Sequence, residues 1–138
     1  IEILIDDLGV EGAAIRGFVD ESTRNDIMRH AKWMVTPPHT QEDLGLTPIE
    51  ARHVGVPCII TRDGGLPEAG GEHALMCEPR DVTGLSLLLE RAAQMPEDEY
   101  RELSKATHEE LLDYLKPMSP YLDHYRELLR ERKDAMEN

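Results

Sequence analysis

Short apolar runs alternate with amphipathic stretches along the first two thirds of the chain. Such runs predict buried strands, because the strands of a parallel sheet are covered on both faces and carry few polar residues. The clearest is Pro57-Cys58-Ile59-Ile60-Thr61, which has no polar side chain before Thr61. Strands are expected over 14–19, 33–36, 57–61 and 74–77.

The amphipathic stretches predict helices with recognisable starts or stops. Gly9 is placed to end a helix that covers residues 1–8. Asp20, Ser22 and Thr23 are candidate N-caps of a helix over about 23–32, which would place Ile27 and Ala31 on one face. Further helices are expected over 47–53 and, after a cap at Asp81 or Thr83, to about 94.

Strands that alternate with helices through brief connections predict βαβ units and a parallel sheet. Ligands of such sheets bind beyond the carboxyl ends of the strands. The loops after Val35 and after Thr61 are therefore the candidate binding loops. Gly64, Gly65, Gly70 and Gly71 are expected to frame a loop after Thr61.

The last third of the chain has no strand pattern. Pro96 is expected to open a helix with acidic residues in its first turn, which the helix dipole favours. Pro117 and Pro120 would end this helix before a final one begins. The expected core face of the first helix comprises Tyr100, Leu103, Leu111 and Leu115, and the final helix carries Tyr121, Tyr125, Leu128 and Leu129.

Charge and cysteine content narrow the environment and the partners. The 138 residues include 15 Lys and Arg against 28 Asp and Glu, a net charge of −13, which disfavours nucleic acid and anionic membrane as partners. No apolar run approaches the roughly 20 residues that span a bilayer.

Cys58 and Cys77 lie in apolar stretches and are expected to be reduced and buried, as in a cytoplasmic protein. The six histidines are scattered, so no metal site is expected. Because the chain begins at Ile1, inside an amphipathic pattern, we expect it to be part of a longer protein.

The segment with the most chemical information lies between Pro37 and Glu68. Thr47, Pro48 and Glu50 fit a capping box, with Thr47 as N-cap and Glu50 three residues later. The same residues also fit a ligand site. Gly45 would let backbone approach a ligand, and the N–H groups of Leu46 and Thr47 would form an anion site for a diphosphate at the helix N-terminus.

Two carboxylates bracket this predicted anion site. Glu42 and Glu50 are separated by seven residues. A carboxylate repels phosphate but accepts hydrogen bonds from hydroxyls, as on a sugar or a ribose. The combination of a helix N-terminus and two such acceptors is suited to a nucleotide sugar.

The Glu42/Glu50 pair, in register with Gly64-Gly65-Leu66-Pro67-Glu68, resembles the C-terminal donor-binding domain of retaining GT-B glycosyltransferases of the group 1 or family 4 type. The resemblance covers about residues 1–94. The sequence departs from the family pattern at Leu44, where Phe is frequent, at Pro38, where Ser is frequent, and at 72–74, where Gly is usual. The Arg and Lys that clamp the diphosphate in the family have no match.

The resemblance implies a role for each matching residue. Glu42, Gly45 and Leu46 would contact the donor sugar, and Leu46 and Thr47 the diphosphate. Glu50 would bind the ribose hydroxyls. The base would lie against Gly17 and Phe18. No residue is assigned as catalytic, and neither a metal nor another cofactor is expected, since the nucleotide sugar is a substrate.

The resemblance also implies an α/β architecture. We expect a truncated Rossmann-like nucleotide-sugar-binding domain over 1–95, with a partial parallel sheet, and a helical C-terminal extension of the same domain over 96–138. Its partners would be the donor and a missing N-terminal domain that carries the acceptor site. The parent would be a hexosyltransferase, and this chain alone would be inactive. Two alternatives stay open: another GT-B enzyme, such as an epimerase or a phosphorylase, and a non-catalytic binding or interaction module that self-associates through an orphaned apolar surface.

Overall fold

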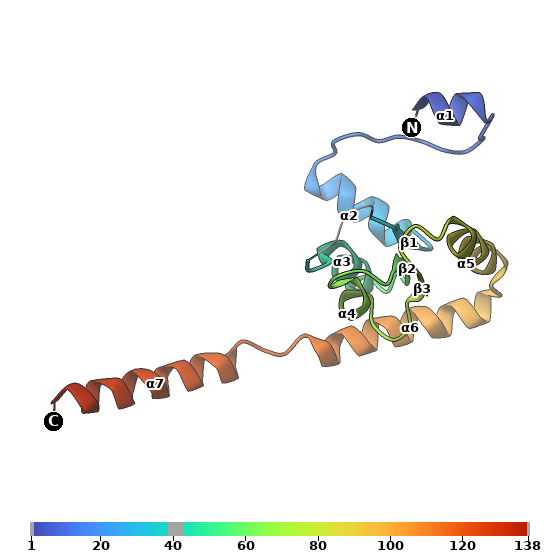
Figure 1. The fold of residues 1–138 in the computed structure, drawn as a ribbon. Helices are drawn as coiled ribbons and strands as arrows, with labels where there is room; N and C mark the ends of the chain where they lie inside the picture. Colours follow the sequence, from blue (N-terminus) through green and yellow to red (C-terminus); the bar gives the residue numbers. More distant parts are fainter. Residues whose placement is uncertain (1, 39–42, 138) are drawn as a thin grey trace.

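A computed structural model describes residues 2–38 and 43–137. From α2 to β3 the described elements alternate between helices and strands, and beyond β3 they are all helical (Figure 1). In chain order they are α1 (Glu2–Asp7), α2 (Glu21–His30), β1 (Met34–Thr36), α3 (Leu46–His53), β2 (Cys58–Thr61), α4 (Leu66–Gly70), β3 (Leu75–Cys77), α5 (Val82–Gln94), α6 (Glu97–Tyr114) and α7 (Ser119–Glu137).

The three described strands form one parallel sheet in the order β1-β2-β3. Met34 pairs with Cys58 across the first ladder, and Thr61 pairs with Cys77 across the second. The predicted parallel α/β architecture with a helical tail is therefore confirmed. All four residues of β2 are buried, as its apolar sequence predicted for a central strand.

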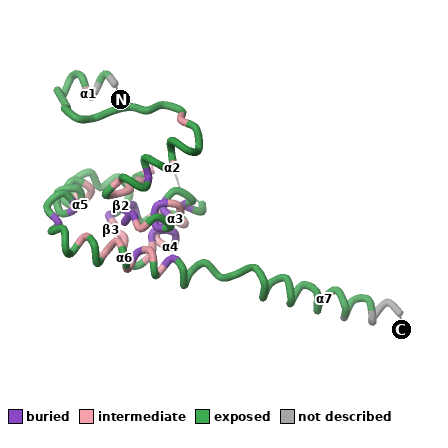
Figure 2. The backbone as a smooth tube through the Cα atoms, turned by 180° about the vertical axis from the view of Figure 1, so that it is seen from behind, coloured by how far each residue is buried: buried purple, intermediate pink, exposed green. Residues whose placement is uncertain are grey.

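Helices cover both faces of the sheet, and the core is divided accordingly. Alternate residues of a strand point to opposite faces. Cys58 and Ile60 pack in a cluster with Ala51 of α3 and Leu66 of α4. Ile59 packs in the other cluster, with Leu85 and Leu88 of α5. Figure 2 shows the buried residues concentrated around the sheet, α3 and α4.

Helix α6 is fastened along this body by side chains that bond to backbone carbonyls. Tyr100 Oη donates to Lys32 O at 2.7 Å, and Ser104 Oγ donates to Gly55 O at 2.5 Å. Leu111 is fully buried, whereas Leu115, expected on the same face, is largely exposed beyond the end of the helix. The bonds from Tyr100 and Ser104 hold α6 against the entry to β1 and the end of α3.

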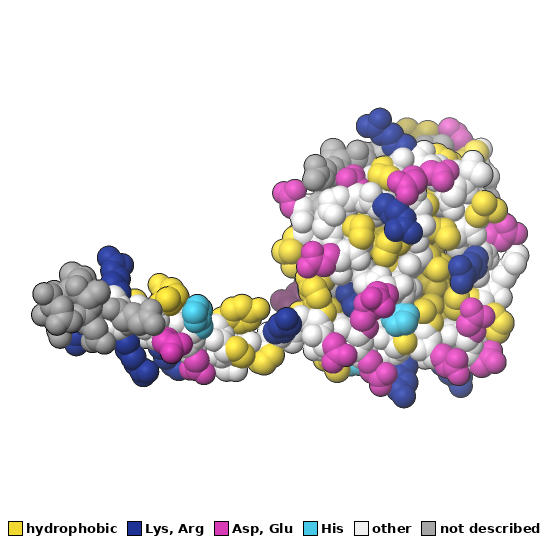
Figure 3. Space-filling model, turned by 60° about the horizontal axis from the view of Figure 1, so that its bottom comes forward, with side chains coloured by type: hydrophobic (Ala, Val, Ile, Leu, Met, Phe, Trp, Pro, Cys, Tyr) yellow, Lys and Arg dark blue, Asp and Glu magenta, His cyan; other side chains and the backbone are white. Residues whose placement is uncertain are grey.

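Helices α1 and α7 project from the body (Figure 1). Figure 3 shows hydrophobic side chains along the projecting α7. Within the described ranges, no helix is long and apolar enough to cross a membrane. The exposed apolar side chains of α7 comprise Tyr121, Leu122, Tyr125, Leu128 and Leu129.

The predicted structure of two segments was wrong. Residues 14–19 do not form a strand, and Ile15 and Phe18 are exposed. A strand needs a hydrogen-bonded neighbour, and within the described sheet nothing pairs with this segment. The loop expected between Gly64 and Gly71 instead contains α4, because Pro67 suits a first helical turn and Leu66 and Ala69 are buried.

Candidate functional site

The start of α3 depends on a glycine in the left-handed region. Gly45 is the N-cap, with φ 71° and ψ 51°. A Cβ built on it would lie 2.7 Å from the Cβ of Ala69, so a side chain would collide with α4. A Cβ on Gly65 would meet the carbonyl oxygen of Asp43. Residues 43–45 therefore pack directly on residues 65–69, and the two glycine motifs of the sequence form one surface.

The predicted capping box is wrong. Thr47 is the second helical residue rather than the N-cap, and the cap Gly45 offers no side-chain hydrogen bond. Close packing of Gly45 on Ala69 begins the helix before Thr47 and thereby removes both Thr47 and Glu50 from their capping positions. In the described part of the chain, no side chain caps the N–H groups of Leu46 and Thr47, both exposed, so they carry the positive end of the helix dipole.

Glu50 lies one turn further along α3 and pairs with a residue of α2. Its Oε1 is 3.4 Å from Arg24 Nη2, and the two side chains are 41% and 47% exposed. Exposed ion pairs contribute little net energy. A ligand can therefore take over either partner at low cost, and the Glu50 carboxylate is available to accept hydrogen bonds from hydroxyls.

Gly17 and Phe18 line a cavity of about 640 Å³, and Arg24, the ion-pair partner of Glu50, lines it as well. Phe18 is fully exposed, which is unusual for an aromatic residue and leaves its ring open to stacking. Through Arg24, the structure connects the predicted base pocket to the predicted ribose ligand Glu50.

Glu42, the predicted sugar ligand, lies outside the described residues. Two arginines near the site were missed from the sequence. Arg24 had no distinguishing pattern within its polar helix. Arg52 is 1% exposed, and its Nη1 donates to Ala69 O at 2.7 Å. Its position between buried Ala51 and an exposed histidine offered no indication that the guanidinium turns inward.

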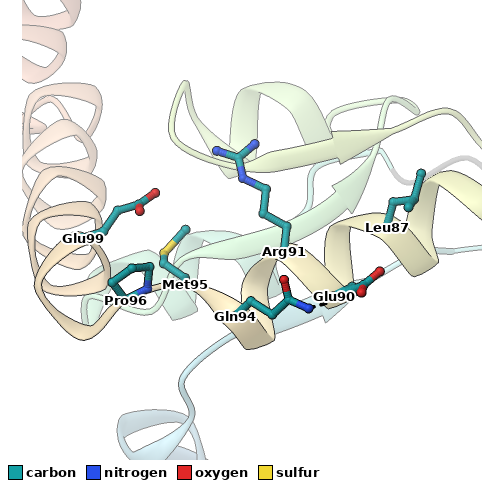
Figure 4. Close-up of a pocket in the computed structure, with 7 residues that line it drawn as sticks. All are labelled: Leu87, Glu90, Arg91, Gln94, Met95, Pro96 and Glu99. Atoms are coloured by element: carbon teal, nitrogen blue, oxygen red, sulfur yellow. Dashed lines mark hydrogen bonds between the residues drawn. The ribbon is translucent and has the colours of Figure 1, made fainter.

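Another cavity, of about 380 Å³, lies between α5 and α6 and shares no lining residue with the groups above (Figure 4). Glu99 of α6 lines one side of it, and Leu87, Glu90, Arg91 and Gln94 of α5 line the other. Tyr100, in the first turn of α6, bonds to Lys32 O just before β1, so the connection from α5 to α6 lies at the amino edge of the sheet. This cavity therefore belongs to the edge opposite the predicted binding loops.

The two cysteines are free and buried, as predicted. Burial raises the pKa of the Cys58 thiol to about 12. Burial and the nearby Asp81 carboxylate raise the pKa of Cys77. Both residues are therefore neutral thiols near neutral pH. Among the described residues, no three His, Cys, Asp or Glu side chains gather closely enough to hold a metal ion.

Comparison of the sequence with known proteins identifies a family and several relatives. Residues 3–110 match the family described as Glycosyl transferases group 1. The chain is 35% identical over 102 residues to N-acetyl-alpha-D-glucosaminyl L-malate synthase of Bacillus anthracis, covering 69% of this chain and 26% of that protein. It is 36% identical over 72 residues to Glycogen synthase of Mycobacterium tuberculosis, covering 51% of this chain and 17% of that protein. It is 35% identical over 74 residues to 2-deoxystreptamine N-acetyl-D-glucosaminyltransferase of Niallia circulans, covering 52% and 19%.

The chain thus spans about a quarter or less of each of these relatives. The family match covers the sheet, the Gly45 and Gly65 segments and most of α6. Since it extends over more than half of the sequence, the chain belongs to the group 1 glycosyltransferase family.

Proposed function

We propose that this chain is the donor-binding part of a retaining glycosyltransferase, which moves a sugar from a nucleotide-diphosphate sugar to an acceptor. Gly45 and the N–H groups of Leu46 and Thr47 bind the diphosphate and the donor sugar. Glu50 binds the ribose, and Gly17 and Phe18 border the base. Glu42 contacts the donor sugar in this proposal.

The observation that carries the proposal is the arrangement at the start of α3. In the described part of the chain no side chain caps the N–H groups of Leu46 and Thr47, and such a helix N-terminus attracts anions. One turn later Glu50 supplies an acceptor for hydroxyls, and its partner Arg24 lines the cavity beside Phe18. The residues proposed to bind phosphate, ribose and base therefore follow one another in the order in which a nucleotide diphosphate presents those groups.

The chemistry of this site is leaving-group stabilisation. In transfer with retention, the bond from the anomeric carbon to the diphosphate oxygen breaks, and the acceptor oxygen bonds to that carbon on the same face. The leaving diphosphate takes the acceptor's proton. Backbone N–H groups of Leu46 and Thr47 stabilise the charge that develops on the diphosphate. Neither Glu42 nor Glu50 acts as a nucleophile, and no metal is required.

The printed names of the relatives indicate the class of sugar. Two are glucosaminyl enzymes and one is a glycogen synthase. We therefore propose that the donor carries a hexose or an N-acetylhexosamine. The donor part alone is expected to bind nucleotide without catalysing transfer, and measurable turnover by this chain would contradict that expectation.

Calorimetric titration of the chain with UDP, GDP and ADP tests the proposal. One nucleotide is expected to bind, and Glu50→Ala should weaken this binding by about tenfold to a hundredfold, because hydrogen bonds to a charged acceptor contribute roughly 1.5–3 kcal/mol. Glu97→Ala is the matched control, since Glu97 is also an exposed carboxylate in an ion pair, with Lys32. Absence of binding by the unmodified chain, or equal losses in both variants, would overturn the donor site.

A further inference from the structure

A third cavity opens at the carboxyl edge of the sheet, on the face opposite α3. It measures about 250 Å³ and touches the end of every described strand. Pro37 and Pro38 follow β1, Thr61 ends β2, and Cys77 ends β3. Val82 and Leu85 of α5 complete its wall. None of its lining residues has a role in the donor site proposed above.

Thr61 provides the strongest indication that this cavity binds something. The residue is 2% exposed, and in the described part of the chain its Oγ1 has no hydrogen-bond partner. Thr61 lies two residues after Ile59, so its side chain is on the α5 face and borders the cavity. A buried hydroxyl without a partner loses its hydration without compensation. A ligand in the cavity would restore that bond.

The polar groups of the wall include both donors and acceptors. Arg80 supplies N–H donors, and Glu78 and Asp81 supply carboxylate oxygens. Glu78 is already 3.6 Å from Arg62, and Asp81 Oδ1 accepts from the N–H of Gly84 at 2.8 Å. The charges are therefore largely balanced, which suits neither an anion nor a cation.

The remaining wall is apolar, formed by the two prolines, Val82 and Leu85. A neutral sugar ring needs hydroxyl partners of both kinds around its rim and an apolar surface for its C–H face. The volume lies just below the roughly 300–1,000 Å³ of sites for drug-sized ligands. One ring fits this cavity, whereas a whole nucleotide sugar does not.

We propose that this cavity binds one pyranose ring of a neutral saccharide, with the Thr61 hydroxyl as a buried hydrogen-bonding partner. Identification of that ring as part of the acceptor rests on the proposed function. Binding of the ring itself does not, because the two sites lie on opposite faces of the sheet and share no residue that the structure describes.

Amide chemical shifts of the isotope-labelled chain, titrated with methyl α-D-glucopyranoside and with N-acetylglucosamine, test the proposal. One of the two saccharides is expected to shift the amides of Thr61, Cys77 and Val82. Thr61→Val should weaken this binding about fivefold to tenfold, which corresponds to the loss of one net hydrogen bond. Thr107→Val is the matched control, because Thr107 is also a buried hydroxyl without a partner among the described residues, but it lies on α6 away from the cavity.

Three results would overturn the proposal: no saccharide-dependent shift at this edge, an unchanged affinity in Thr61→Val, or an equal loss in Thr107→Val. Inorganic phosphate serves as a further probe, since shifts by phosphate in place of saccharide would identify an anion site and contradict the sugar. Titration with UDP in the same experiment keeps the two proposals apart. Nucleotide shifts are expected at Leu46, Thr47 and Glu50, so either site can fail while the other is observed.

Discussion

Arg52 of α3 and Glu110 of α6 form an ion pair, with 3.2 Å between Nη2 and Oε2, in which the arginine is almost completely buried. Arg52 Nη1 donates to Ala69 O of α4, and Glu110 Oε1 accepts from the N–H of Glu72 at 2.8 Å. The pair therefore joins α3, α4 and α6, and α3 and α4 are the helices that pack together at Gly45. Its effect on the site is indirect, through the positions of α3 and α4.

Removal of one partner should destabilise the protein strongly. Glu110→Gln leaves the buried guanidinium without its counter-charge, which costs about 3 kcal/mol in unfolding free energy. Urea unfolding monitored by circular dichroism measures this loss. Glu109→Gln is the control, because Glu109 pairs with Lys105 at the exposed surface and should cost less than about 1 kcal/mol. Similar losses in the two variants would contradict a special role for Glu110.

Gly45→Ala should damage the protein through two effects. The left-handed backbone costs an alanine roughly 1–2 kcal/mol, and the new Cβ collides with Ala69 at 2.7 Å. Gly12→Ala isolates the first effect, since Gly12 also has a positive φ but a Cβ there meets nothing within 4 Å. The difference between their unfolding free energies should be about 1–3 kcal/mol. Equal values would show that residues 43–45 do not pack on α4.

The cap of α2 should make stability depend on pH. Asp20 Oδ1 accepts hydrogen bonds from the N–H of Thr23 at 2.8 Å and the hydroxyl of Ser22 at 2.7 Å. These bonds hold the pKa of Asp20 below its ordinary value of 3.8. Because the folded-state pKa is the lower one, the stabilisation is complete above the ordinary value and is lost as the pH falls through the lowered one.

Comparison with Asp20→Asn measures this contribution, because asparagine also caps helices but does not titrate. Unfolding free energies of both proteins between about pH 6 and pH 2 should converge toward the acidic end. Parallel curves would show that the Asp20 carboxylate does not stabilise α2 through its charge.

The Cys58 thiol should resist alkylation in the folded protein. The thiolate is the reactive species, and burial raises the pKa of Cys58 to about 12. Iodoacetamide at mildly alkaline pH should therefore label Cys58 only as fast as the protein unfolds, with peptide mapping as the measurement; Cys77 lines the cavity at the carboxyl edge and is not part of this prediction. Rapid labelling of Cys58 in the absence of denaturant would contradict its burial.

Arg80→Gly should stabilise the fold and weaken the saccharide site. Arg80 has φ 66°, the one positive φ outside glycine among the described residues. Glycine relieves this conformation, which is expected to raise the unfolding free energy by about 1 kcal/mol. Saccharide affinity should fall at the same time, since the cavity loses its N–H donors. Arg62→Gly, beside the same edge, should bring no such gain in stability.

The local pattern of apolar and polar residues was sufficient to predict the buried strands and the caps of two helices. The strands at 34–36, 58–61 and 75–77 followed from apolar runs bounded by Pro and Gly. Asp20 and Asp81, each one of the candidate caps named from the sequence, cap their helices, because a cap is a contact between neighbours in the chain. The resemblance of Gly45, Glu50 and residues 64–68 to the family pattern could also be recognised from the sequence alone.

Contacts between distant segments decided the rest. Gly45 against Ala69 shifted the start of α3 and released Thr47 and Glu50 from the expected capping box. Residues 14–19 have the composition of a strand but no strand beside them in the described sheet. The inward turn of Arg52 toward Glu110 and the buried hydroxyl of Thr61 depend on helices and strands that meet only after folding. The sequence by itself determined which segments are apolar and where helices begin through local caps. The tertiary structure decided which side chains contact one another, because the contacting residues are separated by tens of positions along the chain.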